Sequence, residues 1–202
     1  MKTPANKYLI SVEGEQKIGK LFVPIVKGAE ENVLRPVLGK IRALPGKLTK
    51  QFEIASNSGG AMLNALMLAR SVEGLKEGDE VYISYMATDK HYFLYHDKGE
   101  DFYVVPVHHL VALKTEDGLK AISGKVLIKP LEIKEFESGL LISVNNKKNI
   151  GIGEVVSSSD GMREKYVPGQ KIVYLEKLAE WIEIDGAKYD FVYTGEVLAT
   201  LG

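Results

Sequence analysis

The sequence predicts an all-β protein made of two similar units. Short runs rich in Val, Ile, Tyr and Phe recur along the chain, and Gly, Pro, Asp and Asn separate them, as expected for short strands and tight turns. Two hairpin turns, Asp97-Lys98-Gly99 and Asp185-Gly186, each lie between a pair of such runs. In addition, the landmarks of the first half recur in the same order in the second half, which indicates an internal repeat.

The predicted strands can be placed in chain order from these runs. They cover residues 7–12, 81–85, 91–96, 101–107, 125–130, 153–158, 171–175, 180–184 and 189–195. One hairpin turn joins the third run to the fourth, and the other joins the last two runs. These two hairpins lie at corresponding places in the two halves.

The repeat is most visible in its glycines. The landmarks are Gly19, Gly39, Gly78 and Gly99 in the first copy and Gly139, Gly153, Gly169 and Gly186 in the second. The second and third landmarks are 39 residues apart in the first copy and 16 apart in the second, so the first copy carries an insertion of 23 residues. We expect a first unit over residues 1–116, a second over 117–202, and a polar, Gly-containing linker around the boundary.

The insertion, near residues 47–74, is predicted to be helical. Residues 59–74 are rich in Ala, Leu and Met, Asn57 or Ser58 is available as an N-cap, and Gly74 is a stop signal. Apolar side chains cover much of the circumference of this segment, so the helix must pack against its own barrel or another subunit. A simple packing element and a modified roof of the barrel are both open interpretations.

Composition excludes several classes of protein. The chain has 202 residues, of which 45% are hydrophobic, a formal net charge of −1 and no cysteine. It therefore lacks the basic surface that nucleic acid or anionic lipid requires, and it cannot form disulfides or thiolate zinc sites. The N-terminus lacks the pattern of a signal or transit peptide and no apolar run reaches membrane-spanning length, so a cytoplasmic protein is expected.

The residues also give no sign of catalysis or of a bound metal or cofactor. His91, His96, His108 and His109 are the only histidines, and no carboxylates at ligand spacing accompany them. In a strand, the adjacent His108 and His109 would point to opposite faces. We therefore expect no enzyme activity, no metal site and no cofactor.

The order of motifs in the second copy resembles that of the GroES-type co-chaperonins, the chaperonin-10 family. A strand is followed by Gly139 with an aliphatic tripeptide, then by a Gly-Glu-Val-Val step at Gly153, a Pro-Gly turn at Gly169, an Asp-Gly hairpin and a closing Gly-Glu-Val-Leu segment. The resemblance spans residues 125–202. Gln170 stands where the family usually has Asp, whereas the first copy keeps Asp79. In plan, the chain is similar to the twin-barrel co-chaperonins of chloroplasts, without their import signal.

The resemblance implies two tandem GroES-like β-barrels, the first with the helical insertion, and a site on each. In the family, a mobile loop carries an aliphatic tripeptide that docks into an apolar groove of the chaperonin. The matching residues are Gly139, Leu140, Leu141 and Ile142 in the second copy and Leu21, Phe22 and Val23 in the first. An apolar triple in a β protein is more often core, but the Ser-Gly before this one and the Asn-Lys run after it favour a loop.

The function implied is that of a co-chaperonin that caps an ATP-dependent, GroEL-type chaperonin ring and encloses an unfolded client. Only the partner would use ATP, and neither nucleic acid nor a membrane is an expected partner. A homo-oligomeric ring is expected, made either of three or four chains that place both barrels in the ring or of seven chains that each place one barrel in it. The alternative is a structural or assembly protein, for example of a phage, that uses tandem barrels without a chaperonin.

Overall fold

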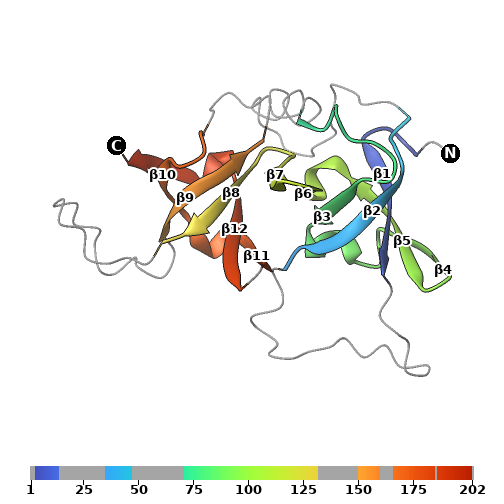
Figure 1. Ribbon diagram of the computed structural model, residues 1–202. Helices are drawn as coiled ribbons and strands as arrows, with labels where there is room; N and C mark the ends of the chain where they lie inside the picture. The colour runs from blue at the N-terminus through green and yellow to red at the C-terminus, as the bar shows by residue number, and fades with distance from the viewer. Residues whose placement is uncertain are drawn as a thin grey trace, which may run out of the picture.

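In a computed structural model, the chain is described over residues 3–13, 35–46, 71–131, 150–159, 166–184 and 186–201. These residues form two β-sheets in which every strand pair is antiparallel (Figure 1). Short 3-10 helices connect some of the strands. The predicted all-β fold class, with two units, is confirmed.

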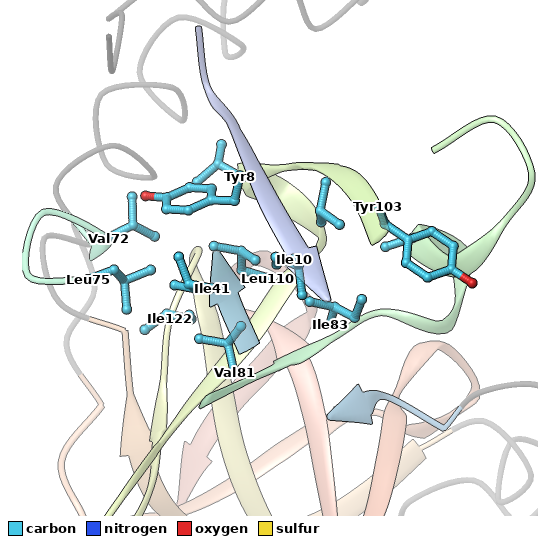
Figure 2. Packing of buried hydrophobic residues seen from close by; sticks show 13 residues of the cluster. Tyr8, Ile10, Ile41, Val72, Leu75, Val81, Ile83, Tyr103, Leu110 and Ile122 are labelled. Atoms are coloured by element: carbon cyan, nitrogen blue, oxygen red, sulfur yellow. The ribbon is translucent and has the colours of Figure 1, made fainter. Parts of the chain in front are cut away.

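The first sheet has seven strands in the order β4-β5-β1-β2-β3-β6-β7. Their bounds are β1 Lys7–Glu13, β2 Val37–Ala43, β3 Glu80–Ile83, β4 Phe93–Asp97, β5 Glu100–Pro106, β6 Leu110–Thr115 and β7 Gly118–Ala121. Burial alternates along β2, β3 and β5, as the two-residue period of a strand with one buried face predicts. Figure 2 shows the resulting core, in which Tyr8 and Ile10 of β1 lie with Ile41 of β2 and with Val81 and Ile83 of β3.

The second sheet has six strands in the order β11-β12-β8-β9-β10-β13. Their bounds are β8 Lys125–Pro130, β9 Ile150–Ser158, β10 Lys171–Leu175, β11 Glu180–Ile184, β12 Ala187–Tyr193 and β13 Val197–Leu201. Its core includes Val126, Ile128, Ile172, Tyr174 and Val192. In the middle of this core, the Tyr174 hydroxyl donates a hydrogen bond of 2.7 Å to the buried carboxylate of Asp190.

The two sheets have the same strand order once β7 is set aside. The strands β4, β5, β1, β2, β3 and β6 correspond in turn to β11, β12, β8, β9, β10 and β13. The β1–β2 pairing shifts register just before Ile10, and the corresponding β8–β9 pairing shifts register just before Ile128. The β3–β6 and β10–β13 pairings also shift register, and each shift leaves one residue without a partner on the opposite strand, Val111 in β6 and Leu198 in β13.

A close approach between strands also recurs at two landmark glycines. A Cβ added to Gly39 would lie 2.5 Å from Cγ2 of Ile10, and one added to Gly153 would lie 2.3 Å from Cγ2 of Ile128. Only glycine lets the neighbouring isoleucine lie over the backbone at this point. The correspondence of the two halves therefore extends from strand order to single side chains.

The β4–β5 turn and the C-terminal end of the insertion are both among the described residues. The turn between β4 and β5 has Lys98 and Gly99 at positive φ, as the hairpin prediction requires. Most of the predicted helical insertion, residues 47–70, lies outside the described residues. Its C-terminal end lies in the first core, where Val72 is 2% exposed and Leu75 is also buried.

The junction between the units is a strand rather than an irregular linker. Residues 116–117 form a turn, and β7 pairs antiparallel with β6, from Ala112 opposite Ala121 to Thr115 opposite Gly118. The first sheet thus continues to residue 121, a few residues beyond the boundary expected at 116. Polar and Gly-rich residues suit a tight hairpin as well as a linker, which explains the difference.

Candidate functional site

The residues expected to bind a chaperonin lie outside the described residues. They are Gly139, Leu140, Leu141, Ile142, Leu21, Phe22 and Val23. Both groups nevertheless fall at equivalent points of the chain, because β1 ends at Glu13 before β2 begins at Val37, and β8 ends at Pro130 before β9 begins at Ile150. Each tripeptide thus belongs to the connection between the first and second strands of its sheet.

The ends of these two connections are held by the strands that flank them. In the second unit the Leu131 backbone N–H donates to the Ile152 carbonyl at 2.9 Å, one residue beyond β8. In the first unit Arg42 of β2 donates to the Ser11 hydroxyl at 2.7 Å and to both carboxylate oxygens of Glu100 at 2.6 and 2.7 Å. In both units, these hydrogen bonds therefore fix the strands that flank the connection.

A second site of interest is the apolar junction at which the two sheets meet. The second unit contributes Leu127 of β8, Ile182 of β11 and Phe191 of β12, which are at most 9% exposed. The first unit contributes Val111 and Ala112 of β6 and Ala121 of β7. Partly buried side chains of both units line the margin: Tyr82 and Leu119 from the first, and Ile184 and Tyr189 from the second. Burial of this cluster holds the two units side by side.

Serine hydroxyl groups add a polar border to the junction. The Ser157 hydroxyl accepts from the Ala121 backbone N–H at 2.9 Å and donates to the Leu119 carbonyl at 3.2 Å. Nearby, the Ser159 hydroxyl accepts from the Gly124 N–H at 3.0 Å. These contacts join β9 of the second sheet to β7 and to the turn that follows it.

A buried lysine lies at the other end of the junction. Lys125 is 2% exposed, its Nζ lies 3.8 Å from the ring centroid of Tyr193 and 3.6 Å from Oε1 of Glu180. The Tyr193 hydroxyl in turn donates to the His108 carbonyl of the first unit at 3.1 Å. A buried ammonium needs such partners, because removing a charge from water without them is costly.

The two adjacent histidines do not lie on opposite faces of a strand, which corrects the sequence expectation. They occupy a 3-10 helix, Val107–His109, between β5 and β6, and their ring centroids are 4.3 Å apart. Nε2 of His109 lies 3.2 Å from the Tyr92 hydroxyl. Burial, with smaller contributions from His108 and Lys125, lowers the pKa of His109 to about 4, and burial followed by Lys125 also lowers the pKa of His108.

The described residues contain no group of three or more His, Cys, Asp or Glu side chains that is arranged to hold a metal ion. Within the same ranges, no helix combines the length and apolar character needed to cross a lipid bilayer.

Reasoning from the sequence did not identify the junction or the Lys125 cluster. One signal was present, because residues 126–128 are three consecutive large aliphatics, a pattern typical of a strand that is buried on both faces. In the structure, residues 125–128 of β8 are all buried. Nothing in the sequence marks Lys125 as different from the exposed lysines.

The second sheet and the strand before it cover the part of the chain that is similar to known proteins. A model of the family described as Chaperonin 10 Kd subunit matches residues 118–201, from the start of β7 to the end of β13. Among individual proteins, Co-chaperonin GroES of Natranaerobius thermophilus is 28% identical over 92 residues, which cover 41% of this chain and 97% of that protein. The family match thus falls on the second half of the chain, and the matched co-chaperonin is covered over almost its whole length.

Proposed function

We propose that the chain is a tandem co-chaperonin that caps an ATP-dependent, GroEL-type chaperonin ring and encloses a folding client. The observation that carries this proposal is the match of residues 118–201 to the Chaperonin 10 Kd subunit family over a complete β unit. The co-chaperonin would perform no catalysis and hold no cofactor of its own, because ATP would be used by the partner. A cytoplasmic location is part of the same proposal.

The first unit enters the proposal through its strand order, which corresponds to that of the second. We infer that residues 1–116 and 117–202 are two GroES-like barrels, with an insertion near residues 47–74 in the first. The correspondence of Gly39 with Gly153, each beneath an isoleucine of the neighbouring strand, supports this inference. Client proteins would be enclosed without direct recognition, and neither nucleic acid nor a membrane is proposed as a partner.

Contact with the chaperonin would be made by the aliphatic tripeptides, Leu140 to Ile142 and, in the first unit, Leu21 to Val23. Burying one such side chain contributes about 1.5–3 kcal/mol, and ordering the connection that carries it offsets much of this gain. One tripeptide would therefore bind weakly. Several on one assembly would bind firmly through effective concentration, yet release when the chaperonin moves its grooves.

The test is binding of the purified protein to a GroEL-type chaperonin, with and without ATP, followed by size-exclusion chromatography. We expect a complex that depends on nucleotide. Leu141→Asp should weaken it at least about 100-fold, because a carboxylate in an apolar groove has no partner.

The matched control is Val167→Asp, which adds the same charge to the same unit at a residue that is 60% exposed and outside the proposed site. This variant should bind like the original protein, and both variants should keep the original melting temperature. Failure of the original protein to bind any GroEL-type chaperonin would instead support a structural or assembly role for the tandem barrels. A large loss of stability in Leu141→Asp would show that Leu141 belongs to a core.

A further inference from the structure

The two units are joined by residues 122–124, which we call the connector. It follows β7 of the first sheet and leads directly into β8 of the second. Two consecutive connector residues have left-handed backbone dihedrals, with φ 55° at Ser123 and φ 75° at Gly124. Glycine adopts this region freely, but serine does so only where its surroundings hold it there, and Ser123 is fully buried.

The connector is hydrogen-bonded to both sheets. On the side of the first unit, the Ile122 backbone N–H donates to the Val111 carbonyl at 3.1 Å. On the side of the second unit, the Gly124 N–H donates to the Ser159 hydroxyl at 3.0 Å, and the Gly124 carbonyl accepts from the Thr194 N–H at 3.0 Å. These bonds make the connector a fixed joint in place of a flexible linker.

Ser123 adds two hydrogen bonds to the first unit, and one of them leads to the insertion. Its hydroxyl donates to the Val107 carbonyl at 2.8 Å, and its backbone N–H donates to the Ser71 hydroxyl at 3.0 Å. Ser71 is buried at the C-terminal end of the insertion, and the next residue, Val72, lies in the first core together with Ile122 (Figure 2). A buried N–H that lost its acceptor would be costly, so the Ser71 hydroxyl stabilises the connector in this conformation.

The same turn occurs before the first sheet, where the residue that matches Ser123 is different. There Asn6 has φ 58°, and its carbonyl accepts from the Val107 N–H at 3.0 Å, as that of Gly124 does from Thr194. The correspondence of the strands places Ala5 at the position of Ser123, and Ala5 is exposed and has no hydroxyl. The turn itself therefore requires neither a serine nor burial, and the Ser71–Ser123 hydrogen bond is a feature of the joint between the units.

We propose that the insertion fixes the orientation of the two units relative to each other, with Ser71 as the positioning residue. Burial of the apolar junction opposes separation of the units, but it is non-directional and opposes rotation less. The hydrogen bond from Ser123 to Ser71 is directional and holds the backbone of the joint itself. A contact that displaces the end of the insertion therefore also changes the orientation of the second unit. None of these contacts depends on binding to a chaperonin.

Pulsed electron paramagnetic resonance between two spin labels measures this orientation. The chain has no cysteine, so Leu38→Cys on β2 and Leu198→Cys on β13, both at exposed residues, provide one label in each sheet. The doubly labelled original protein should give one narrow distance distribution, and Ser71→Ala should broaden or shift it. In the same variant, the Ser123 amide should exchange with solvent at least about 10-fold faster, because its acceptor is gone.

Two further variants separate this role from a general loss of stability. Ser123→Gly removes the hydroxyl that holds Val107 while allowing left-handed dihedrals, and it should broaden the distribution as well, since glycine reaches many other conformations. Ser84→Ala is the matched control, because it removes a buried hydroxyl that accepts from the Met86 N–H inside the first unit, and it should leave the distribution unchanged. The proposal is overturned if the original protein gives a broad distribution, if Ser71→Ala keeps the original distance distribution or the original exchange rate, or if Ser84→Ala broadens the distribution as much as Ser71→Ala does.

Discussion

Substituting Gly153 by alanine tests the packing of the second sheet most directly. The new Cβ would lie 2.3 Å from Cγ2 of Ile128 and 2.8 Å from the backbone carbonyl oxygen of Lys129. Carbon atoms in contact are normally about 3.5–4.0 Å apart, so the methyl group overlaps its neighbour by more than about 1 Å. The Lys129 carbonyl belongs to the strand itself and cannot rotate away, so β8 and β9 must separate locally.

The structure also ranks three alanine substitutions. Overpacking of this kind costs about 1–3 kcal/mol and occasionally more, so we expect Gly153→Ala to destabilise the second unit by about 3 kcal/mol. Gly39→Ala should cost less, because its contacts are 2.5 Å to Ile10 and 3.1 Å to a carbonyl oxygen. Gly195→Ala should be neutral or slightly stabilising, since nothing beyond the adjacent residues lies within 4 Å of the added Cβ and alanine restricts the unfolded chain.

Urea titration followed by tryptophan fluorescence measures this effect, because Trp181 is the only tryptophan and lies on β11 of the second sheet. Adding Ile128→Ala to Gly153→Ala should relieve only part of the clash, so the double variant should lose less than the sum of the single changes. A Gly153→Ala protein within about 0.5 kcal/mol of the original would refute the close packing of β8 on β9. So would a larger loss in Gly195→Ala.

Three further predictions concern buried groups. Tyr174→Phe removes the 2.7 Å hydrogen bond to the buried Asp190 carboxylate and should cost about 1–3 kcal/mol in calorimetry; an unchanged melting temperature would contradict this. Val72→Ala should cost about 2 kcal/mol, measured by hydrogen exchange in the first sheet, and an unaffected sheet would show that residue 72 lies outside that core. Burial lowers the pKa of His109 from 6.5 to about 4, so the unfolded chain binds a proton that the folded chain excludes between these values. Stability should be complete above pH 6.5 and fall as the pH approaches 4, by about 1–2 kcal/mol at pH 5, and His109→Gln should flatten this part of the urea-midpoint profile.

The strands that could be predicted from the sequence are those with a clear two-residue period or a strong turn beside them. The β4–β5 hairpin is the best example, since Gly99 and Lys98 must adopt positive φ and few sequences allow that. Strands β2, β6, β7 and β13 were not predicted as separate elements. The Asp117-Gly118 step between β6 and β7 is itself a turn signal, but the polar residues around it suit a linker equally well, so the hairpin was not distinguished from a linker.

The candidate sites also differ in whether a local sequence pattern marks them. The tripeptides stand out because Leu140 to Ile142 follow a glycine and precede polar residues, a local pattern that can be read from the sequence. The junction could not be predicted, because Phe191 and Leu127 look like ordinary core residues until the second sheet is placed beside the first. The prediction for His108 and His109 was wrong for a related reason: a 3-10 helix of three residues ends β5 there, and no local signal marks it.

The junction between the two units has a consequence for the energetics of assembly. Separate single-unit proteins must meet by diffusion to form a contact of this kind, and dilution breaks it. Here residues 122–124 join β7 of the first sheet to β8 of the second, so the effective concentration of the two units is on the order of millimolar or higher however dilute the protein becomes. Every chain therefore brings one side-to-side contact that is already formed, and an assembly of such chains would have to gain only every second contact from solution.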